Sequence, residues 1–201
     1  MSTKNEQGSN PSIVLGVTGS IAAFKAVELL RLMQKKEWDV SVVMTVAATR
    51  FVSALTFQTL SKNTVGMGLF DEVDGWHPEH IAYADRADVL LIAPCTANVI
   101  AKLAHGLADD LLTCTALATQ APLVIAPAMN DHMWAHPATG ANVALLQSRG
   151  VTFVEVAKGD LACGRAGEGR LADLPIILSV VESVLSTSVL IRGERACRKM
   201  Y

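Results

Sequence analysis

The stretch IVLGVTGSIAAFK, residues 13–25, joins a short apolar run to a Gly-Ser turn and then to a segment with helical spacing. Ile13 to Val17 forms the run, and apolar residues recur at helical intervals from Ile21 to Lys35. This order predicts a strand that passes through a tight turn into a helix. Backbone amides and the helix dipole at such a turn attract a phosphate, although a glycine there also serves simple tight packing. Because the GxGxxG pattern is absent, the turn favours a single phosphate, as in a mononucleotide, over a dinucleotide.

Further strands and helices alternate along the chain. Strands are predicted at 39–44, 89–93, 122–126 and 151–156, and helices at 49–60, 97–119 and 173–185. A break is expected near Gly106, with Asp109 and Asp110 in the first turn of a second helix, and the Gly-rich piece 62–78 is expected to be loop with a short strand. Unbroken apolar strands separated by helices are typical of a parallel sheet covered on both faces. We therefore expect one α/β domain at 13–186, with a doubly wound, Rossmann-like and flavodoxin-like three-layer fold.

Both ends of the chain and one Gly-rich segment fall outside this pattern. The polar residues 1–12 are expected to be disordered, and 187–201, with a basic cluster from Arg192 to Lys199, are expected to form a tail. Residues 158–170 contain GDLACGRAGEGR, which is too rich in glycine and polar residues for a regular element. This segment is predicted to be a mobile flap.

The composition favours a small-molecule ligand. The 201 residues are 51% hydrophobic with a formal net charge of −2, and no Lys/Arg cluster is interleaved with aromatic residues, which argues against nucleic acid or an anionic membrane as the main partner. No apolar run reaches the ~18 residues of a membrane span and no hydrophobic signal core opens the chain, so a cytoplasmic location is expected. The four cysteines form no CxxC pair, so neither a disulfide framework nor a metal site is indicated.

The stretch PAMNDHMW, residues 127–134, leaves the end of the apolar run 123–126. Loops at the carboxyl ends of strands in open α/β sheets bind ligands. Here Asn130 stands among Met129, Met133 and Trp134, which offers an apolar wall beside a neutral donor and acceptor. The pattern suits an aromatic cofactor next to a small polar group, and the alternative is a turn in which the methionines and the tryptophan only pack.

Four other places carry polar or reactive side chains. Thr45 ends the second strand, and the strand 89–93 runs into PCTAN. Thr96 or Asn98 could bind the polar edge of a ring system there, or could equally be only the cap of the next helix. His80 has a side chain that titrates near neutral pH and so suits proton transfer, although most single histidines have no such role. Cys163, on the predicted flap, is either a proton donor or a spare thiol.

Taken together, GSIAAFK, HIAYADRAD, APCTAN, PAMNDHMW and ACGRAGEGRL occur in the order, and at roughly the intervals, of the flavin-dependent cysteine decarboxylases. The chain resembles this family from about Ile13 to Leu185, and most closely those members that decarboxylate 4′-phosphopantothenoylcysteine in coenzyme A synthesis. The resemblance implies FMN as cofactor and a homo-oligomer built from trimers, either a trimer or a dodecamer. Many bacterial members carry a second domain fused to this one.

The resemblance also implies three groups of functional residues. Its catalytic positions fall on His80, Asn130 and Cys163. Its FMN-binding positions fall on Gly19, Ser20, Ile21, Ala22, Thr45, Pro94, Thr96, Ala97, Asn98 and Ala128. Its substrate-binding positions fall on Asn130, Met133, Ala162, Cys163 and Gly164. The chain departs from the family pattern at Tyr83 and Cys95, neither of which is a catalytic position.

The implied reaction is an oxidative decarboxylation through thioaldehyde and enethiolate intermediates. Oxidation by FMN creates the electron sink that carbon dioxide loss needs. His80 is the candidate base for the thiol, Cys163 the candidate acid for the last step, and Asn130 would hold the carboxylate with a neutral amide.

Two alternatives stay open at this point. One is a peptidyl-cysteine decarboxylase of peptide-antibiotic maturation, which uses the same three residues on a C-terminal cysteine. The other is a non-catalytic FMN-binding regulatory protein, although such relatives usually carry long acidic extensions or lack the flap cysteine. A flavin prenyltransferase ranks lower, because that group does not combine the PxMNxxMW asparagine with a flap cysteine.

Overall fold

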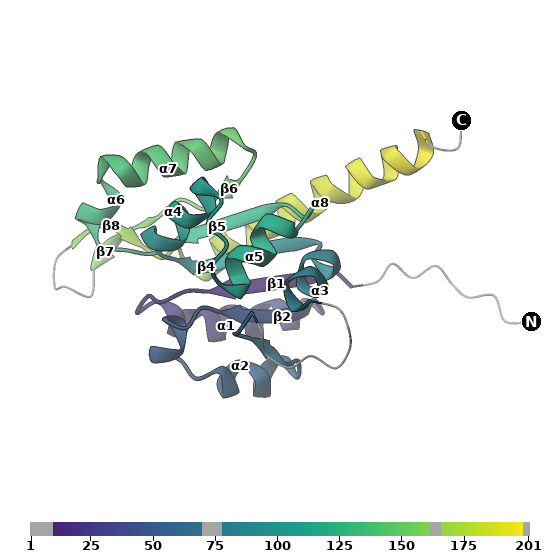
Figure 1. Cartoon of the computed structure of the whole chain (residues 1–201), viewed down its shortest axis with the longest axis horizontal. Helices are drawn as coiled ribbons and strands as arrows, with labels where there is room; N and C mark the ends of the chain where they lie inside the picture. The colour runs from purple at the N-terminus through teal and green to yellow at the C-terminus, as the bar shows by residue number, and fades with distance from the viewer. Residues whose placement is uncertain (1–9, 70–77, 161–165, 199–201) are drawn as a thin grey trace, which may run out of the picture.

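The computed structural model describes residues 10–69, 78–160 and 166–198. Six parallel strands form one sheet in the order β3-β2-β1-β4-β5-β6, and a separate two-stranded hairpin lies beside it (Figure 1). The strands are β1 (Ser12–Val17), β2 (Asp39–Met44), β3 (Val65–Gly66), β4 (Val89–Cys95), β5 (Leu123–Pro127), β6 (Thr152–Phe153), β7 (Ala157–Asp160) and β8 (Ala166–Arg170). The helices are α1 (Ala23–Lys35), the 3-10 turn η1 (Ala48–Arg50), α2 (Ala54–Ser61), α3 (Glu79–Arg86), α4 (Ala97–His105), α5 (Leu111–Ala118), α6 (Asp131–Trp134), α7 (Pro137–Ser148) and α8 (Leu174–Arg198).

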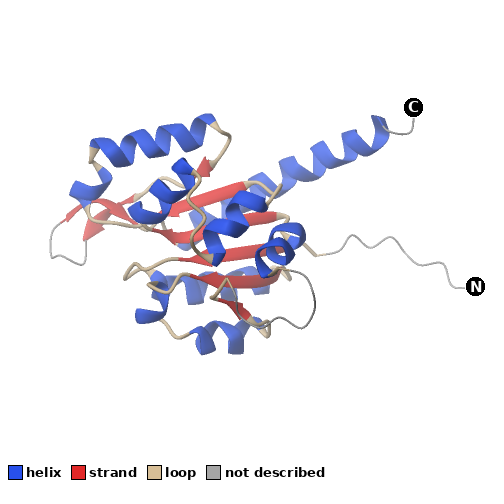
Figure 2. Ribbon diagram, in the orientation of Figure 1, coloured by secondary structure: helices blue, strands red, loops and turns tan. Residues whose placement is uncertain are grey.

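Helices lie on both faces of the sheet (Figure 2), and an apolar cluster fills the space on each face. Because successive side chains of a strand point to opposite faces, Ile13 and Leu15 of β1 join one cluster while Val14 joins the other. The first cluster packs against α1, α2 and α8, and the second against α3, α4, α5 and α7. Buried apolar runs therefore become parallel strands between two helical layers, which confirms the doubly wound three-layer prediction.

Several predicted helix boundaries need correction. The segment 49–60 is not one helix, because η1 ends at Arg50 and Ser53 then caps α2 by accepting a hydrogen bond from the Leu55 N–H at 3.3 Å. The break near Gly106 is confirmed, since this residue has a left-handed φ of 68° and ends α4. Asp110 caps α5 and so precedes its first turn. β1 begins at Ser12, one residue inside the segment expected to be disordered.

The last helix is much longer than predicted. It was expected to end near Leu185, but α8 continues to Arg198 through most of the predicted tail. The hydroxyls of Ser186 and Thr187 donate to the carbonyls of Glu182 and Ser183, so these polar side chains are satisfied within the helix. No helix of the described residues is long and apolar enough to cross a membrane.

The predicted flap has a regular base. Its two sides, β7 and β8, pair as an antiparallel hairpin, so the expectation of no regular element at 158–170 was wrong. Residues 161–165, between the two strands, lie outside the described residues. Backbone pairing and the docking of β8 onto α6 make the hairpin, and neither leaves an apolar period in the sequence.

Candidate functional site

The site lies where the sheet changes winding direction. The chain runs from β1 to β3 on one side and from β4 to β6 on the other, so the carboxyl ends of β1 and β4 form the topological switch point. The buried hydroxyl of Thr18 joins these two ends, donating to the Pro94 carbonyl at 2.7 Å and accepting from the Thr96 N–H at 3.0 Å. Thr18 therefore fixes the turn after β1 against the start of α4, a role that the sequence did not reveal.

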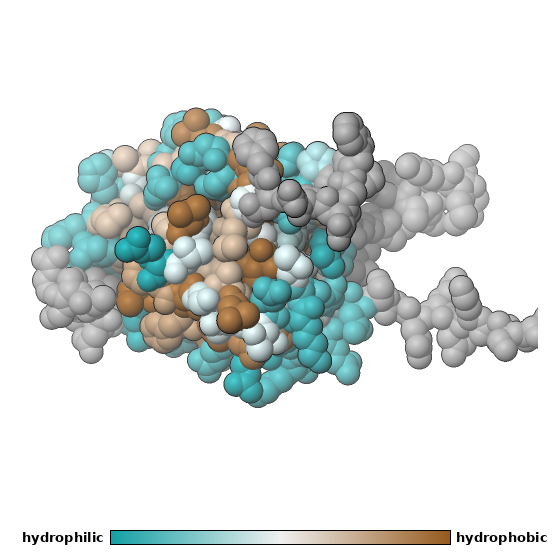
Figure 3. Space-filling model, turned by 60° about the horizontal axis from the view of Figure 1, so that its bottom comes forward, coloured by the Kyte–Doolittle hydropathy of each residue, from teal (hydrophilic) through white to brown (hydrophobic). Residues whose placement is uncertain are grey.

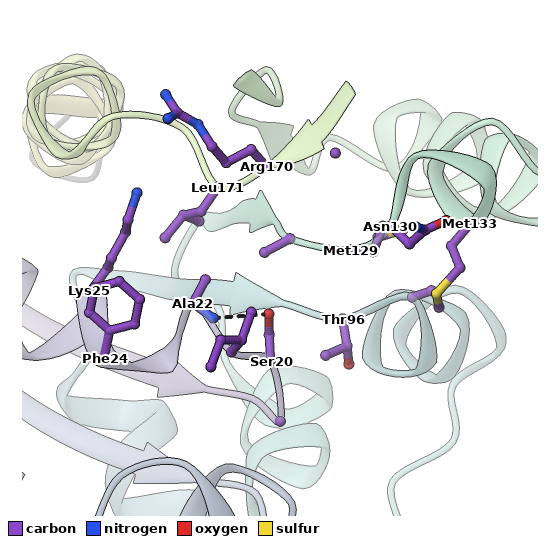
Figure 4. Close-up of a pocket in the computed structure, with 15 residues that line it drawn as sticks. Ser20, Ala22, Phe24, Lys25, Thr96, Met129, Asn130, Met133, Arg170 and Leu171 are labelled. Atoms are coloured by element: carbon purple, nitrogen blue, oxygen red, sulfur yellow. Dashed lines mark hydrogen bonds between the residues drawn. The ribbon is translucent and has the colours of Figure 1, made fainter. Parts of the chain in front are cut away.

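A cavity of about 560 Å³ opens at this point (Figure 4). It is formed by the turn after β1, the start of α4, the segment after β5 and the end of β8. Its lining residues are Gly19, Ser20, Ile21, Ala22, Phe24, Lys25, Thr96, Ala97, Ala128, Met129, Asn130, Met133, Gly169, Arg170 and Leu171. The wall is mostly apolar with a few polar groups, which is typical of a cofactor site.

The turn after β1 fits a phosphate group. A Cβ on Gly19 would come within 2.5 Å of the Ala47 Cβ, so only glycine allows this close approach. The Ser20 hydroxyl accepts a hydrogen bond from the Ala22 N–H at 3.3 Å. Helix α1 starts without a side-chain cap and without an acidic residue in its first turn. The positive end of its dipole is thus left for an anion.

Asn130 is held in place as a helix cap. Its side-chain oxygen accepts a hydrogen bond from the His132 N–H at 2.9 Å, which fixes the amide at the start of α6. The segment before it is anchored on both sides, because the Ala128 N–H donates to the Cys95 carbonyl at 3.0 Å and the Met129 N–H donates to the Gly169 carbonyl at 2.9 Å. The amide therefore sits on a rigid edge of the cavity.

Glycines in β8 allow the hairpin to close this edge. A Cβ on Gly167 would come within 2.7 Å of the Asp131 Cβ, and one on Gly169 within 2.5 Å of the Met129 oxygen. Gly169 also has a φ of 132°, a conformation that side chains rarely adopt. Close backbone packing thus brings Gly169, Arg170 and Leu171 into the cavity wall. Alternating glycines in AGEGR were the only sequence signal for these residues.

Most of the predicted cofactor and substrate positions meet in this one cavity. The lining includes Gly19, Ser20, Ile21, Ala22, Thr96, Ala97, Ala128, Asn130 and Met133. Thr96 both caps α4 and lines the cavity, so its capping role is confirmed while its contact with a cofactor stays a prediction. Phe24, Lys25 and Leu171 line the cavity without having been predicted.

Other predicted positions do not line the cavity or fall outside the described residues. Thr45 and Pro94 are buried, and the Thr45 hydroxyl accepts from the Ala48 N–H at 3.3 Å. Asn98 is exposed on α4. None of these three lines the cavity. Ala162, Cys163 and Gly164 fall outside the described residues.

His80 is also absent from the cavity wall. It lies in the first turn of α3, a helix that packs against α5. Within the described part of the chain, its buried Nδ1 atom has no hydrogen-bond partner. A single copy of the chain therefore does not bring His80 and Asn130 into one pocket.

The charged side chains on the described wall of the cavity are all positive. Lys25 and Arg170 are the charged residues of its described lining, and no carboxylate lines it. Cys95 is buried at the end of β4, and this burial raises the pKa of its thiol well above the ordinary value. No group of three His, Cys, Asp or Glu side chains suited to a metal ion occurs among the residues that the structure describes.

A family profile described as Flavoprotein matches residues 1–186. The chain belongs to the Flavoprotein family. This flavoprotein is 47% identical over 174 residues to the coenzyme A biosynthesis bifunctional protein CoaBC of Bacillus subtilis, covering 87% of the chain but 43% of that relative. It is 45% identical over 175 residues to a probable phosphopantothenoylcysteine decarboxylase of Streptococcus mutans, covering 86% of the chain and 98% of that relative. The chain thus spans less than half the length of its bifunctional relative.

Solved structures agree with this family placement. A mutant PPC decarboxylase in complex with pantothenoylaminoethenethiol matches the flavoprotein with a TM-score of 0.77 and 33% identity, over 87% of this chain and 97% of the other. The FMN binding protein AtHal3 matches with a TM-score of 0.76 and 33% identity, over 89% and 98% of the two chains. The resemblance to flavin-dependent cysteine decarboxylases, predicted from five motifs, is confirmed.

Proposed function

We propose that this flavoprotein binds FMN and decarboxylates 4′-phosphopantothenoylcysteine to 4′-phosphopantetheine, a step of coenzyme A synthesis. The observation that carries the proposal is one cavity that combines a phosphate-type turn, apolar walls and the capped amide of Asn130. The names and coverage of the Streptococcus mutans relative and of the substrate-analogue complex support it. The substrate is small and diffusible, which accords with the cytoplasmic location expected from the sequence.

The residues present fit FMN. Gly19, Ser20 and Ile21 would receive its phosphate, while Ala128 and Met129 offer an apolar wall for its ring system. Bound FMN supplies a reversible electron acceptor, which allows the carbon bearing the sulfur to be oxidised so that carbon dioxide can leave. Thr45 and Pro94 do not line the cavity, so in place of the predicted direct contacts they would act through hydrogen bonds to Ala48 and Thr18.

Asn130 would hold the substrate carboxylate. Its oxygen serves the helix cap, so donation to the carboxylate comes from its NH₂ group. A neutral amide is suited to this task, because a cation would stabilise the starting carboxylate as well as the transition state and so gain little rate.

The variant Asn130→Asp separates these two roles. Aspartate caps a helix as well as asparagine does, but it presents a negative charge and no NH₂ group to the substrate. We expect a folded, FMN-containing protein without decarboxylase activity. An Asn130→Asp or Asn130→Lys variant that turned over at the wild-type rate would contradict the role of the amide.

His80 would complete the site from another copy of the chain. Exposed apolar side chains lie close to the cavity, with Ile21 and Phe24 on its wall and Val46, Phe51 and Leu55 around η1 and α2. Figure 3 brings the α1–α2 side forward and shows apolar residues, in brown, gathered in the middle of that face. An exposed apolar area beside a ligand site suits a contact between copies, in agreement with the expected trimers or multiples of trimers.

Mixing inactive variants tests this shared site. A His80→Asn protein and an Asn130→Asp protein, each inactive, should regain part of the activity when their subunits are exchanged, because some interfaces then combine one intact residue from each copy. If oligomers shown to be mixed recovered no decarboxylase activity, the site would not be shared, and His80 and Asn130 would act within the same subunit.

The reaction itself is tested by anaerobic incubation of the FMN-loaded protein with 4′-phosphopantothenoylcysteine, following carbon dioxide and product by mass spectrometry. A Cys163→Ser variant should accumulate the oxidised enethiol, because Cys163 is the proposed acid of the last step. If the fully loaded wild-type protein forms no product, the coenzyme A assignment fails. A C-terminal peptidyl-cysteine substrate, tested in parallel, then becomes the relevant one.

A further inference from the structure

Two cations, Lys25 and Arg170, line the same cavity. In Figure 4, the side chains of Lys25 and Arg170 lie on the side opposite Asn130 and Met133, with Ser20 and Thr96 between the two sides. Lys25 comes from α1 and Arg170 from the end of β8, so the fold brings them to one wall from distant parts of the sequence. The positive charge is therefore concentrated at the end of the cavity away from the capped amide.

Lys25 stands where a lysine is costly without an anion. It is the third residue of α1, inside the first turn, where the positive end of the helix dipole opposes a cation. No acidic residue occupies this first turn, and within the described residues no carboxylate forms an ion pair with Lys25. A bound anion would offset both the dipole and the neighbouring positive charge.

Arg170 is held in position by a neighbour. Its guanidinium donates to the Asp173 carboxylate at 3.1 Å, a contact just outside the cavity. This contact uses one edge of a planar group that has five donor hydrogens, so the guanidinium can also donate to a ligand. A guanidinium held in this way, in the same cavity as a lysine, is suited to a phosphate.

We propose that Lys25 and Arg170 form a second anion subsite, which binds the terminal phosphate of the substrate while the Gly19–Ile21 turn holds the phosphate of the cofactor. The proposal rests on the function proposed above and extends it to substrate selection. The substrate carries an anion at each end, and the cavity offers a neutral amide at one side and two cations at the other. A peptide ending in cysteine has no such phosphate, so the subsite favours the pantetheine class.

The experiment compares ligands with and without the phosphate. Binding of 4′-phosphopantetheine and of pantetheine to the FMN-loaded protein is measured by titration calorimetry, and KM is measured for phosphopantothenoylcysteine and pantothenoylcysteine. The variants are Lys25→Gln and Arg170→Gln. The matched control is Lys35→Gln, an exposed lysine at the far end of the same helix. FMN retention is recorded for each protein.

We expect the wild-type protein and the control to prefer the phosphorylated ligand. Each variant should reduce this preference by on the order of tenfold or more, because charge-assisted hydrogen bonds to a phosphate are lost. The ratio of the two dissociation constants is the decisive quantity, since a merely structural role weakens both ligands alike. An equal loss for both ligands would overturn the proposal.

A different result would assign the cations to the cofactor. If the variants lose FMN while the phosphate preference persists, the anion that they bind is the cofactor phosphate, and the proposal is wrong. If the proposed function itself is wrong, the result differs from both of these, because the wild-type protein then forms no product from phosphopantothenoylcysteine. The subsite is then judged from calorimetry alone, by whether the preference for phosphopantetheine depends on Lys25 and Arg170.

Discussion

Replacement of Gly169 by alanine should damage the cavity wall through a backbone effect. Its φ of 132° is strained for any residue with a side chain, which costs about 1–3 kcal/mol. The new Cβ would also lie within 2.5 Å of the Met129 oxygen, so the hairpin must move and the hydrogen bond from the Met129 N–H to the Gly169 carbonyl is lost, at about 0.5–1.5 kcal/mol. The total is about 2–4 kcal/mol. At 2–4 °C per kcal/mol for a chain of this size, Tm should fall by roughly 5–15 °C.

The matched control is Gly140→Ala. Gly140 lies inside α7, and a Cβ there would meet nothing within 4 Å, so alanine should stabilise the helix by about 0.5–1 kcal/mol. The two variants are compared by thermal unfolding, FMN affinity and trypsin cleavage at Lys158 in β7 and Arg170 at the end of β8. Gly169→Ala should lower Tm, weaken FMN binding and speed cleavage. If Gly169→Ala matched the control in all three measurements, the docking argument would be refuted.

Three further predictions concern groups around the cavity. Thr18→Val removes a buried hydroxyl that makes two hydrogen bonds, so it should lower the free energy of unfolding by about 1–3 kcal/mol and weaken FMN binding. The control Thr18→Ser keeps the hydroxyl and should retain FMN. Equal FMN affinities of the two variants would contradict the role of the hydroxyl. Burial raises the pKa of Cys95, so this thiol should resist alkylation in the native protein at pH 8 and react only after unfolding, as mass spectrometry can show. Hydrogen bonding between Lys102 and Asp109 raises the pKa of the lysine and lowers that of the carboxyl, so the stability it adds should be lost as pH falls through the lowered carboxyl pKa or rises through the raised lysine pKa. Lys102→Met should remove this pH dependence in denaturant titrations.

The sequence predicted the sheet well because its strands are continuous apolar runs. It did not predict α3, α6 or α7, because α3 buries only Tyr83 and Ala84, α6 has no buried residue, and α7 shows little apolar periodicity. The hairpin was missed for a different reason. Its strands are stabilised by pairing and by close backbone approach at Gly167 and Gly169, and such contacts leave no hydrophobic pattern.

The site was predicted to the extent that it follows the sheet. The turn after β1 and the segment after β5 come directly from carboxyl ends of strands, so their residues meet at the switch point. Lys25 and Arg170 were not predicted, since their meeting depends on how α1 and the docked hairpin are oriented. For His80 the reverse holds. Its motif was recognised in the sequence, but the sequence did not show that α3 places it away from the cavity that Asn130 lines.

The double use proposed for Asn130 would account for an asparagine at this position. Its oxygen caps α6, so the side chain cannot rotate freely, and the same constraint directs the remaining part of the amide toward the cavity. Aspartate would cap the helix but repel a carboxylate, and lysine would attract the carboxylate but leave the helix uncapped. Serine would cap it with a single hydroxyl and no amide donor. Of these residues, only asparagine caps the helix and also offers an uncharged amide NH₂ group, which is the donor proposed for the substrate carboxylate.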